Sequence, residues 1–448
     1  MNIQLSDHFT YEKLLRFTIP SIAMLIVTSV YGVVDGLFVS NIVGKEAFAA
    51  VNLIYPFIAV FGAVGFMFGT GGSALVAKTF GEQKPDQAKQ IFTMLIVLLG
   101  VLGILCAAIG IYFLRAIASA FGAEGQLLEY CVQYGRIILS VLPAFMLQTT
   151  FQTFFITAEK PHLGLIFSLA SGVTNVIFDF LFIYVFSWGI TGAAAATGMS
   201  QLVGGVIPLF YFGRQNSSIL RFVRFHWDLR AIFHACSNGL SEMVSNLSFS
   251  LMNMLYNYQL MRFFGPDGVS AYGIIMYVAF IFDGVYMGYS IGCAPVISYH
   301  YGAQNRRELQ NLFKKSNILI CIFAVVLTGG AELTAAKLTG FFVGYDAELL
   351  ALSTYALRAY SICYLLCGLN IFASSLFTAL NNGPISAFIS GVRMLVFESS
   401  MVVLIPMLVG MNGIWFAVTV AEILALTMNI CIYRWKNKEY GFLPERAE

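Results

Sequence analysis

Apolar runs long enough to cross a lipid bilayer follow one another along the whole of this 448-residue chain. A hydrocarbon core about 30 Å thick needs about 20 residues of helix. Runs of at least that length fall near residues 14–40, 47–77, 91–114, 126–156, 162–186, 190–213, 232–261, 269–299, 316–336, 348–379, 385–409 and 412–433. The sequence therefore predicts an all-α polytopic membrane protein with twelve transmembrane helices.

Composition argues against a soluble protein and against a nucleic-acid-binding protein. Charged residues make up 11% of the chain and hydrophobic residues 58%, whereas a soluble domain carries about 25% charged residues. The formal net charge of +2 provides no basic field, so we expect no nucleic-acid partner. The eight cysteines lie in or beside apolar runs and the five histidines are scattered. This pattern predicts buried thiols and no structural metal site.

Basic residues are divided unequally between the two sets of segments that connect the apolar runs. Of the 25 Lys and Arg residues, 18 flank the runs on the side that holds both chain ends, and 4 flank them on the other side. Because Lys and Arg concentrate in cytoplasmic loops, we expect both termini in the cytoplasm. The expected location is the plasma (inner) membrane, which the chain crosses many times.

The two halves of the sequence are related by a shift of 221 residues. Without a gap, this shift aligns Gly44 with Gly265, Ala50 with Ala271, Gly71 with Gly292, Gly81 with Gly302, Gln83 with Gln304 and Phe92 with Phe313. We therefore predict two pseudo-symmetric six-helix lobes joined by a cytoplasmic linker at 214–231. The first lobe is 1–213, and the second is 232–448, which includes a short cytoplasmic tail. Two halves in the same orientation are typical of transporters, with the substrate path between them.

Polar residues inside apolar runs are functional candidates because a carboxylate in hydrocarbon is costly. Asp35, Asp179 and Thr197 lie at similar distances from the outer ends of their runs, roughly 8 to 11 Å deep at a rise of about 1.5 Å per residue. Asn175 lies one turn below Asp179 on the same helix face. These oxygen donors suit a Na⁺ ion or a shared proton. The alternative is that they only hydrogen-bond one helix to another.

The second half is chemically different, because the shift places Tyr256 where the first half has Asp35. Its intramembrane charges are expected nearer the middle of the bilayer, where ion pairs between different helices would account for part of them. They are Glu242, Asp283, Glu398, Glu422, Arg358 and Arg393. The excess of acid over base favours a cationic substrate in a cavity between the halves.

Aromatic and methionine side chains suit flat hydrophobic cations. We expect the cavity to be lined by Tyr31, Tyr55, Phe61, Met252, Tyr256, Met276 and Met287, with Glu242 and Asp283 adding charge. Pro20 interrupts the hydrogen bonding of the first span and is a candidate hinge. A fixed kink at Pro20 is the alternative.

The run IPSIAMLIVTSVYGVVDGLFVSNIVGKEAFAAVNLIYP at 19–56 resembles the first-span signature of the MATE (multidrug and toxic compound extrusion) transporters. The similarity extends through NVIFDFLFIYVF at 175–186, GITGAAAATGMSQ at 189–201, SGVRML at 390–395 and GMNGIW at 410–415, and TAEKPHLG at 157–164 resembles the bacterial DinF-like branch. The resemblance implies a V-shaped pair of lobes. It also implies that Asp35, Asn175, Asp179 and Thr197 form a cation site. Many members carry asparagines on the fourth span in that site, whereas FQTFF here offers Gln152 and Thr153.

The resulting hypothesis is a secondary active antiporter that works by alternating access as a monomer and needs no cofactor. It would export amphipathic, mostly cationic organic compounds in exchange for H⁺ or Na⁺. The first alternative is a flippase of lipid-linked precursors. A membrane-embedded enzyme is a more distant alternative, because the sequence contains no HExxH motif and no grouping of His and Asp within the apolar runs.

Overall fold

Helices account for almost all of residues 3–443, the part of the chain that the computed structural model describes. The N-terminal half consists of α1 (Tyr11–Phe38), η1 (Val39–Val43), α2 (Lys45–Gly81), α3 (Pro85–Ala120), α4 (Gly125–Ser140), α5 (Leu142–Thr157), α6 (Pro161–Asp179), η2 (Phe180–Val185) and α7 (Gly189–Gly213). The C-terminal half consists of α8 (Leu229–Gly302), α9 (Arg306–Val343), α10 (Ala347–Ser361), α11 (Tyr364–Ala379), α12 (Gly383–Gly391), η3 (Val392–Glu398), α13 (Ser399–Val409), η4 (Met411–Gly413) and α14 (Ile414–Tyr440).

These helices provide the twelve predicted spans within residues 3–443. Nine continuous helical segments are long and apolar enough to cross a membrane, and two bent pairs each add one more. The pair α4–α5 bends by 57° and the pair α10–α11 by 45°. The 74-residue α8 crosses twice, because its helical backbone is interrupted at Gly265, where φ is 62°. A positive φ is readily adopted by glycine and rarely by other residues.

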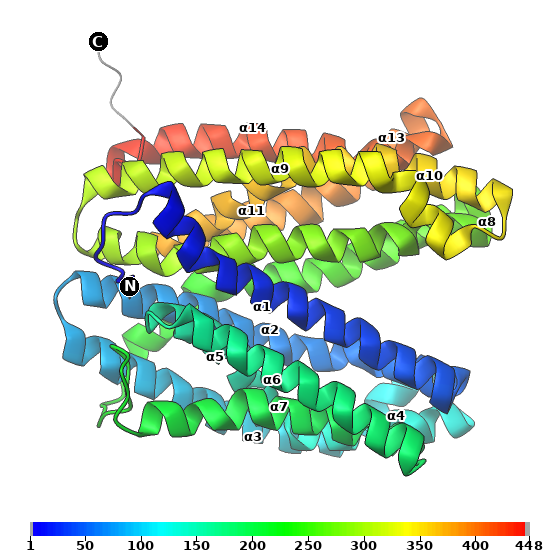
Figure 1. Ribbon diagram of the computed structural model, residues 1–448, viewed down its shortest axis with the longest axis horizontal. Helices are drawn as coiled ribbons and strands as arrows, with labels where there is room; N and C mark the ends of the chain where they lie inside the picture. The colour runs from blue at the N-terminus through cyan, green and yellow to red at the C-terminus, as the bar shows by residue number, and fades with distance from the viewer. Residues whose placement is uncertain (1–2, 444–448) are drawn as a thin grey trace.

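The two halves lie side by side and diverge from one end of the molecule to the other (Figure 1). The end at which the halves are close together is named the basic end. It comprises residues 82–84, 158–160, 214–228 and 303–305 and both described chain ends. We name the other end, which comprises 39–44, 121–124, 186–188, 344–346 and 410–413, the opposite end. The predicted V-shaped arrangement of two lobes is therefore observed, with the V open at the opposite end.

Glycines bring the two halves into backbone contact near the basic end. A Cβ on Gly81 would lie 2.0 Å from the carbonyl oxygen of Tyr299, and a Cβ on Gly302 would lie 2.1 Å from that of Lys78. Only glycine therefore fits where the ends of α2 and α8 cross. Gly81 and Gly302 are partners under the 221-residue shift, so the contact obeys the symmetry that the sequence predicts.

A non-helical segment, residues 3–10, crosses the basic end and contacts both halves; we name it the N-terminal strap. The backbone N–H of Leu5 donates to Glu159 Oε1 of the N-terminal half at 2.7 Å. The N–H of Phe9 donates to Glu308 Oε1 of the C-terminal half at 3.0 Å, and His8 Nδ1 lies 2.7 Å from Glu308 Oε2. The side chains of Leu5 and Phe9 are completely buried, so the strap is part of the packed structure.

Candidate functional site

Four polar side chains from three helices meet toward the opposite end of the N-terminal half. Asp35 lies in the last turn of α1, Asn175 and Asp179 in the last two turns of α6, and Thr197 in α7. The other three side chains lie around the Asp35 carboxyl, close enough to act on its charge. Asn175 and Asp179 are buried, with 1% and 0% of their surfaces exposed. We name Asp35, Asn175, Asp179 and Thr197 the N-half cluster.

Local helix geometry helps to place the N-half cluster. Asn175 and Asp179 are four residues apart on α6 and therefore share one face. The π-helical segments η1 and η2 begin close after Asp35 and directly after Asp179, respectively. A π-helical turn changes the rotational phase of a helix and is frequent at functional sites.

The buried oxygens of the N-half cluster have no hydrogen-bond partner among the described residues. They are Asp35 Oδ1, both carboxyl oxygens of Asp179, Asn175 Oδ1 and Thr197 Oγ1. The ion pairs formed within residues 3–443 include neither aspartate, and Arg136 of α4 is exposed. A set of oxygen donors without a basic neighbour suits a monovalent cation or a proton.

Tyr134 is an additional member of this environment that the sequence analysis missed. It comes from α4, is 5% exposed, and lies next to Thr197 and near both aspartates. A tyrosine in a mostly apolar run gives no signal of its own, and α4 was predicted only as part of the span at 126–156. Its hydroxyl is both a donor and an acceptor, so it can respond when the cluster gains or loses a positive charge.

The C-terminal half contains a buried ion pair in place of this cluster. Arg393 of η3 donates to Glu422 Oε1 of α14 from Nε at 2.9 Å and from Nη2 at 2.7 Å. Asn370 donates to Glu422 Oε2 at 2.6 Å. Asp283 and Glu398 lie near enough to interact with both charges of the pair. Arg393 therefore has its partner on another helix, as expected.

Comparison with known proteins decides the family. The family model described as MatE matches residues 20–181 and 243–404, once in each half. The chain belongs to the MatE family. A multidrug export protein MepA from Staphylococcus saprophyticus is 23% identical over 427 residues, 94% of this chain and 91% of that protein.

Solved structures show the same fold as this MatE protein. A structure titled as the outward-facing conformation of a multidrug resistance MATE family transporter has a TM-score of 0.92 and 19% identity, and covers 98% of both chains. A MATE in the straight conformation has a TM-score of 0.91 and 19% identity, and covers 97% of this chain and 98% of that one. Family membership places the chain among transporters and not among enzymes. The narrower DinF-like assignment stays a prediction.

Gln152 does not lie in the N-half cluster of this MatE protein. Its Nε2 contacts Ser168 Oγ at 3.5 Å, and Ser168 precedes Asp179 by eleven residues on α6, or about 16 Å of helix. This corrects the expectation that Gln152 supplies the position that asparagines hold in other members. The resemblance of the fourth span to the family did not determine how deep in the membrane the Gln152 side chain lies.

The residues expected in the cavity divide into two groups. Tyr55 is 60% exposed, and Tyr31, Phe61, Glu242, Met276, Asp283 and Met287 are partly exposed. Met252 and Tyr256 are instead 4% and 1% exposed, in the core of the C-terminal half. There Tyr256 donates to the carbonyl oxygen of Ile414 and stacks on Tyr272. These two residues therefore do not line a cavity in this structure.

Two further expectations concern single residues. The side chain of Arg358, expected near mid-membrane, is 55% exposed, and its Nε lies 3.9 Å from Glu332 Oε2 of the preceding helix; its depth in the membrane stays a prediction. The helix α1 continues through Pro20 from Tyr11 to Phe38. The role of Pro20 as a hinge stays a prediction.

The buried pair of Arg393 and Glu422 makes a stability prediction. Arg393→Met leaves the Glu422 carboxylate buried without its guanidinium, and breaking such a pair costs about 3–5 kcal/mol. We expect this variant to unfold at much lower temperature in detergent than the wild type. The double variant Arg393→Met/Glu422→Gln removes both charges and should recover most of the loss. A double variant as unstable as the single one would contradict this account.

Proposed function

We propose that this MatE protein is a secondary active exporter of amphipathic, mostly cationic organic compounds in exchange for H⁺ or Na⁺. The observation that carries the proposal is the N-half cluster, in which two carboxylates meet without a basic partner and with unsatisfied oxygens. A carboxylate pair of this kind can hold a proton or a Na⁺ ion and release it. An ion gradient can then bias the conformational equilibrium, because the ion binds one state better than the other.

The arrangement of the halves supports alternating access. The halves are packed together at the basic end and diverge at the opposite end (Figure 1). The unequal distribution of Lys and Arg supports a plasma-membrane orientation in which the basic end and both termini face the cytoplasm. In that orientation the structure is open toward the outside, the side on which an exporter releases its substrate.

The chemistry of the exposed and partly exposed residues supports cationic substrates. Tyr55 and Phe61 of α2 and Met276 and Met287 of α8 present aromatic rings and thioethers that suit flat hydrophobic cations. Asp283 is partly exposed on α8 and would add negative charge. The names of the multidrug export relatives are consistent with such substrates.

Uptake of a fluorescent organic cation into inside-out vesicles tests this proposal. A pH gradient and a Na⁺ gradient are imposed separately, and we expect one of them to drive uptake above the level without a gradient. The same vesicles with an ionophore that collapses the gradient are the control. Uptake that is equal with and without both gradients would overturn ion coupling. Uptake of neither cationic nor neutral organic compounds would overturn the assignment as an exporter.

A further inference from the structure

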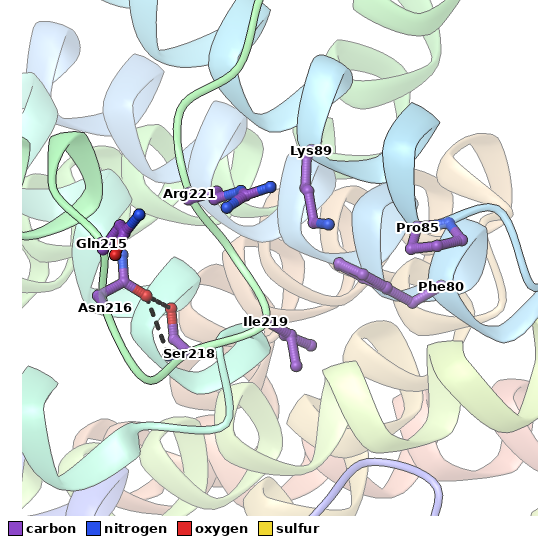
Figure 2. A pocket seen from close by; sticks show the side chains of 8 residues that line it. All are labelled: Phe80, Pro85, Lys89, Gln215, Asn216, Ser218, Ile219 and Arg221. Carbon is purple, nitrogen blue, oxygen red and sulfur yellow. Dashed lines mark hydrogen bonds between the residues drawn. The ribbon is translucent and has the colours of Figure 1, made fainter.

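A hollow of about 650 Å³ at the basic end is distinct from the N-half cluster and lies where the turn between α2 and α3 meets the linker at 214–228. Figure 2 shows its lining of Phe80, Pro85, Lys89, Gln215, Asn216, Ser218, Ile219 and Arg221. The wall on the linker side is held by Asn216, whose Oδ1 accepts from Ser218 N at 2.9 Å and from Ser218 Oγ at 2.7 Å. The hollow is therefore shaped by a fixed turn of the linker.

Two positive charges face this hollow from different elements. In Figure 2 the guanidinium end of Arg221, from the linker, extends toward the side chain of Lys89, from α3. Arg221 takes part in none of the ion pairs formed by residues 3–443, and Lys89 has only Asp86, at 3.7 Å. Because Asp86 is 92% exposed, water screens this pair strongly and it adds little. The two like charges would be stabilised by an anion between them.

The hollow lies at the level where lipid headgroups are expected. The linker runs along the first turns of α3, where Val223 N donates to Thr93 Oγ1 at 3.1 Å. Near the end of the linker Trp227 is 59% exposed, and exposed tryptophans favour the interface between lipid and water. Farther along α3, Val97 and Ile104 are 40% and 63% exposed and provide an apolar surface for acyl chains. Val97 is eight residues from Lys89, about 12 Å along the helix.

We propose that this hollow binds the phosphate headgroup of an anionic phospholipid. Lys89 and Arg221 contact the phosphate, and Arg221 can do so with two N–H groups. Phe80 and Ile219 form the apolar part of the lining, beside the glycerol and the first acyl carbons. Basic pockets at the membrane surface bind anionic headgroups in this way. Because Phe80 belongs to the last turn of α2 and Ile219 to the linker between the halves, the lipid would hold the linker against the N-terminal half.

Native mass spectrometry of the full-length protein in detergent tests this site with phosphatidylglycerol and phosphatidylcholine as probes. We expect preferential binding of phosphatidylglycerol. The variant Lys89→Gln/Arg221→Gln should lower the affinity about 30-fold, because each basic residue near an anionic headgroup contributes about fivefold. The matched control Arg307→Gln/Lys314→Gln removes two exposed charges of the same basic end outside the hollow and should bind as the wild type does.

Three outcomes would overturn the proposal. The first is equal binding of the two lipids, and the second is an equal loss of affinity in the control variant. The third outcome comes from a separate experiment, in which inorganic phosphate is added to protein without anionic lipid and thermal unfolding is measured. If phosphate raises the melting temperature as much as phosphatidylglycerol does, the site takes a soluble phosphate compound and the lipid assignment fails. Circular dichroism and gel filtration establish that the variants are folded.

Discussion

Replacing Asp35 with Asn abolishes ion-driven export in vesicles while the protein stays folded and inserted; this is the first expected result. An amide has nearly the shape of the carboxyl but cannot change its charge when an ion binds or leaves. Export by Asp35→Asn and by Asp179→Asn should therefore fall to the level of vesicles without the protein. The measurement is uptake of a fluorescent cation under an imposed gradient, with gel filtration to verify folding.

Two variants make this experiment specific. Glu129→Gln removes a carboxylate that forms an exposed pair with Arg115, at 2.7 Å between Nη2 and Oε1, and should export as the wild type does. Tyr134→Phe keeps the ring next to Thr197 but removes the hydroxyl, so we expect a reduced rate with coupling retained. Wild-type export by Asp35→Asn would show that the N-half cluster does not couple the ion to transport.

The second large effect is expected at the glycines where α2 and α8 cross. The Cβ of Gly302→Ala would lie 2.1 Å from the carbonyl oxygen of Lys78, so the two backbones must move apart. Overpacking of this kind costs about 1–3 kcal/mol, which is about 5- to 150-fold in a conformational equilibrium. We expect the ratio of molecules closed at the basic end to molecules open there to decrease by a factor in this range. The same change at Gly81 should act similarly.

Distances between spin labels on the two halves measure this shift. Asp86→Cys and Arg307→Cys place the labels on exposed positions of the basic end, in a background without the native cysteines. The control is Gly330→Ala in α9, where a Cβ has no neighbour within 4 Å. An unchanged distance distribution in Gly302→Ala would show that the glycine contact does not hold the halves together.

The number of spans and the division into halves followed from the sequence because apolar length and glycine position are local properties. The bends inside two spans did not follow from the sequence in the same way. Pro143 near the start of α5 is a local signal for the bend after α4. The bend between Ser361 and Tyr364 has no proline or glycine within it. It depends on how α10 and α11 pack on other helices, which a single segment does not encode.

The sequence predicted how deep the site residues lie along their helices, but not the direction in which each side chain points. A constant rise per residue placed Asp35, Asp179 and Thr197 at one level, and the structure brings them together. The rotation of a helix about its axis depends on its neighbours. Met252 and Tyr256 were therefore predicted to line a cavity, whereas they face the core. Tyr134 was missed for the same reason. Its hydroxyl belongs to the site only because the packing of α4 places it next to Thr197.

The N-terminal strap makes fewer hydrogen bonds to the N-terminal half than to the C-terminal half. The N–H of Leu5 makes one hydrogen bond to the N-terminal half, whereas Phe9 is held in the C-terminal half through its N–H and through its carbonyl oxygen, which accepts from Asn311 and Lys315. When the halves separate at the basic end, the strap should leave Glu159 and travel with the C-terminal half. Uncovering the Leu5 side chain would then cost about 1.5–3 kcal/mol. Residues 3–10 would thereby stabilise the state that is closed at the basic end before any ion or substrate binds.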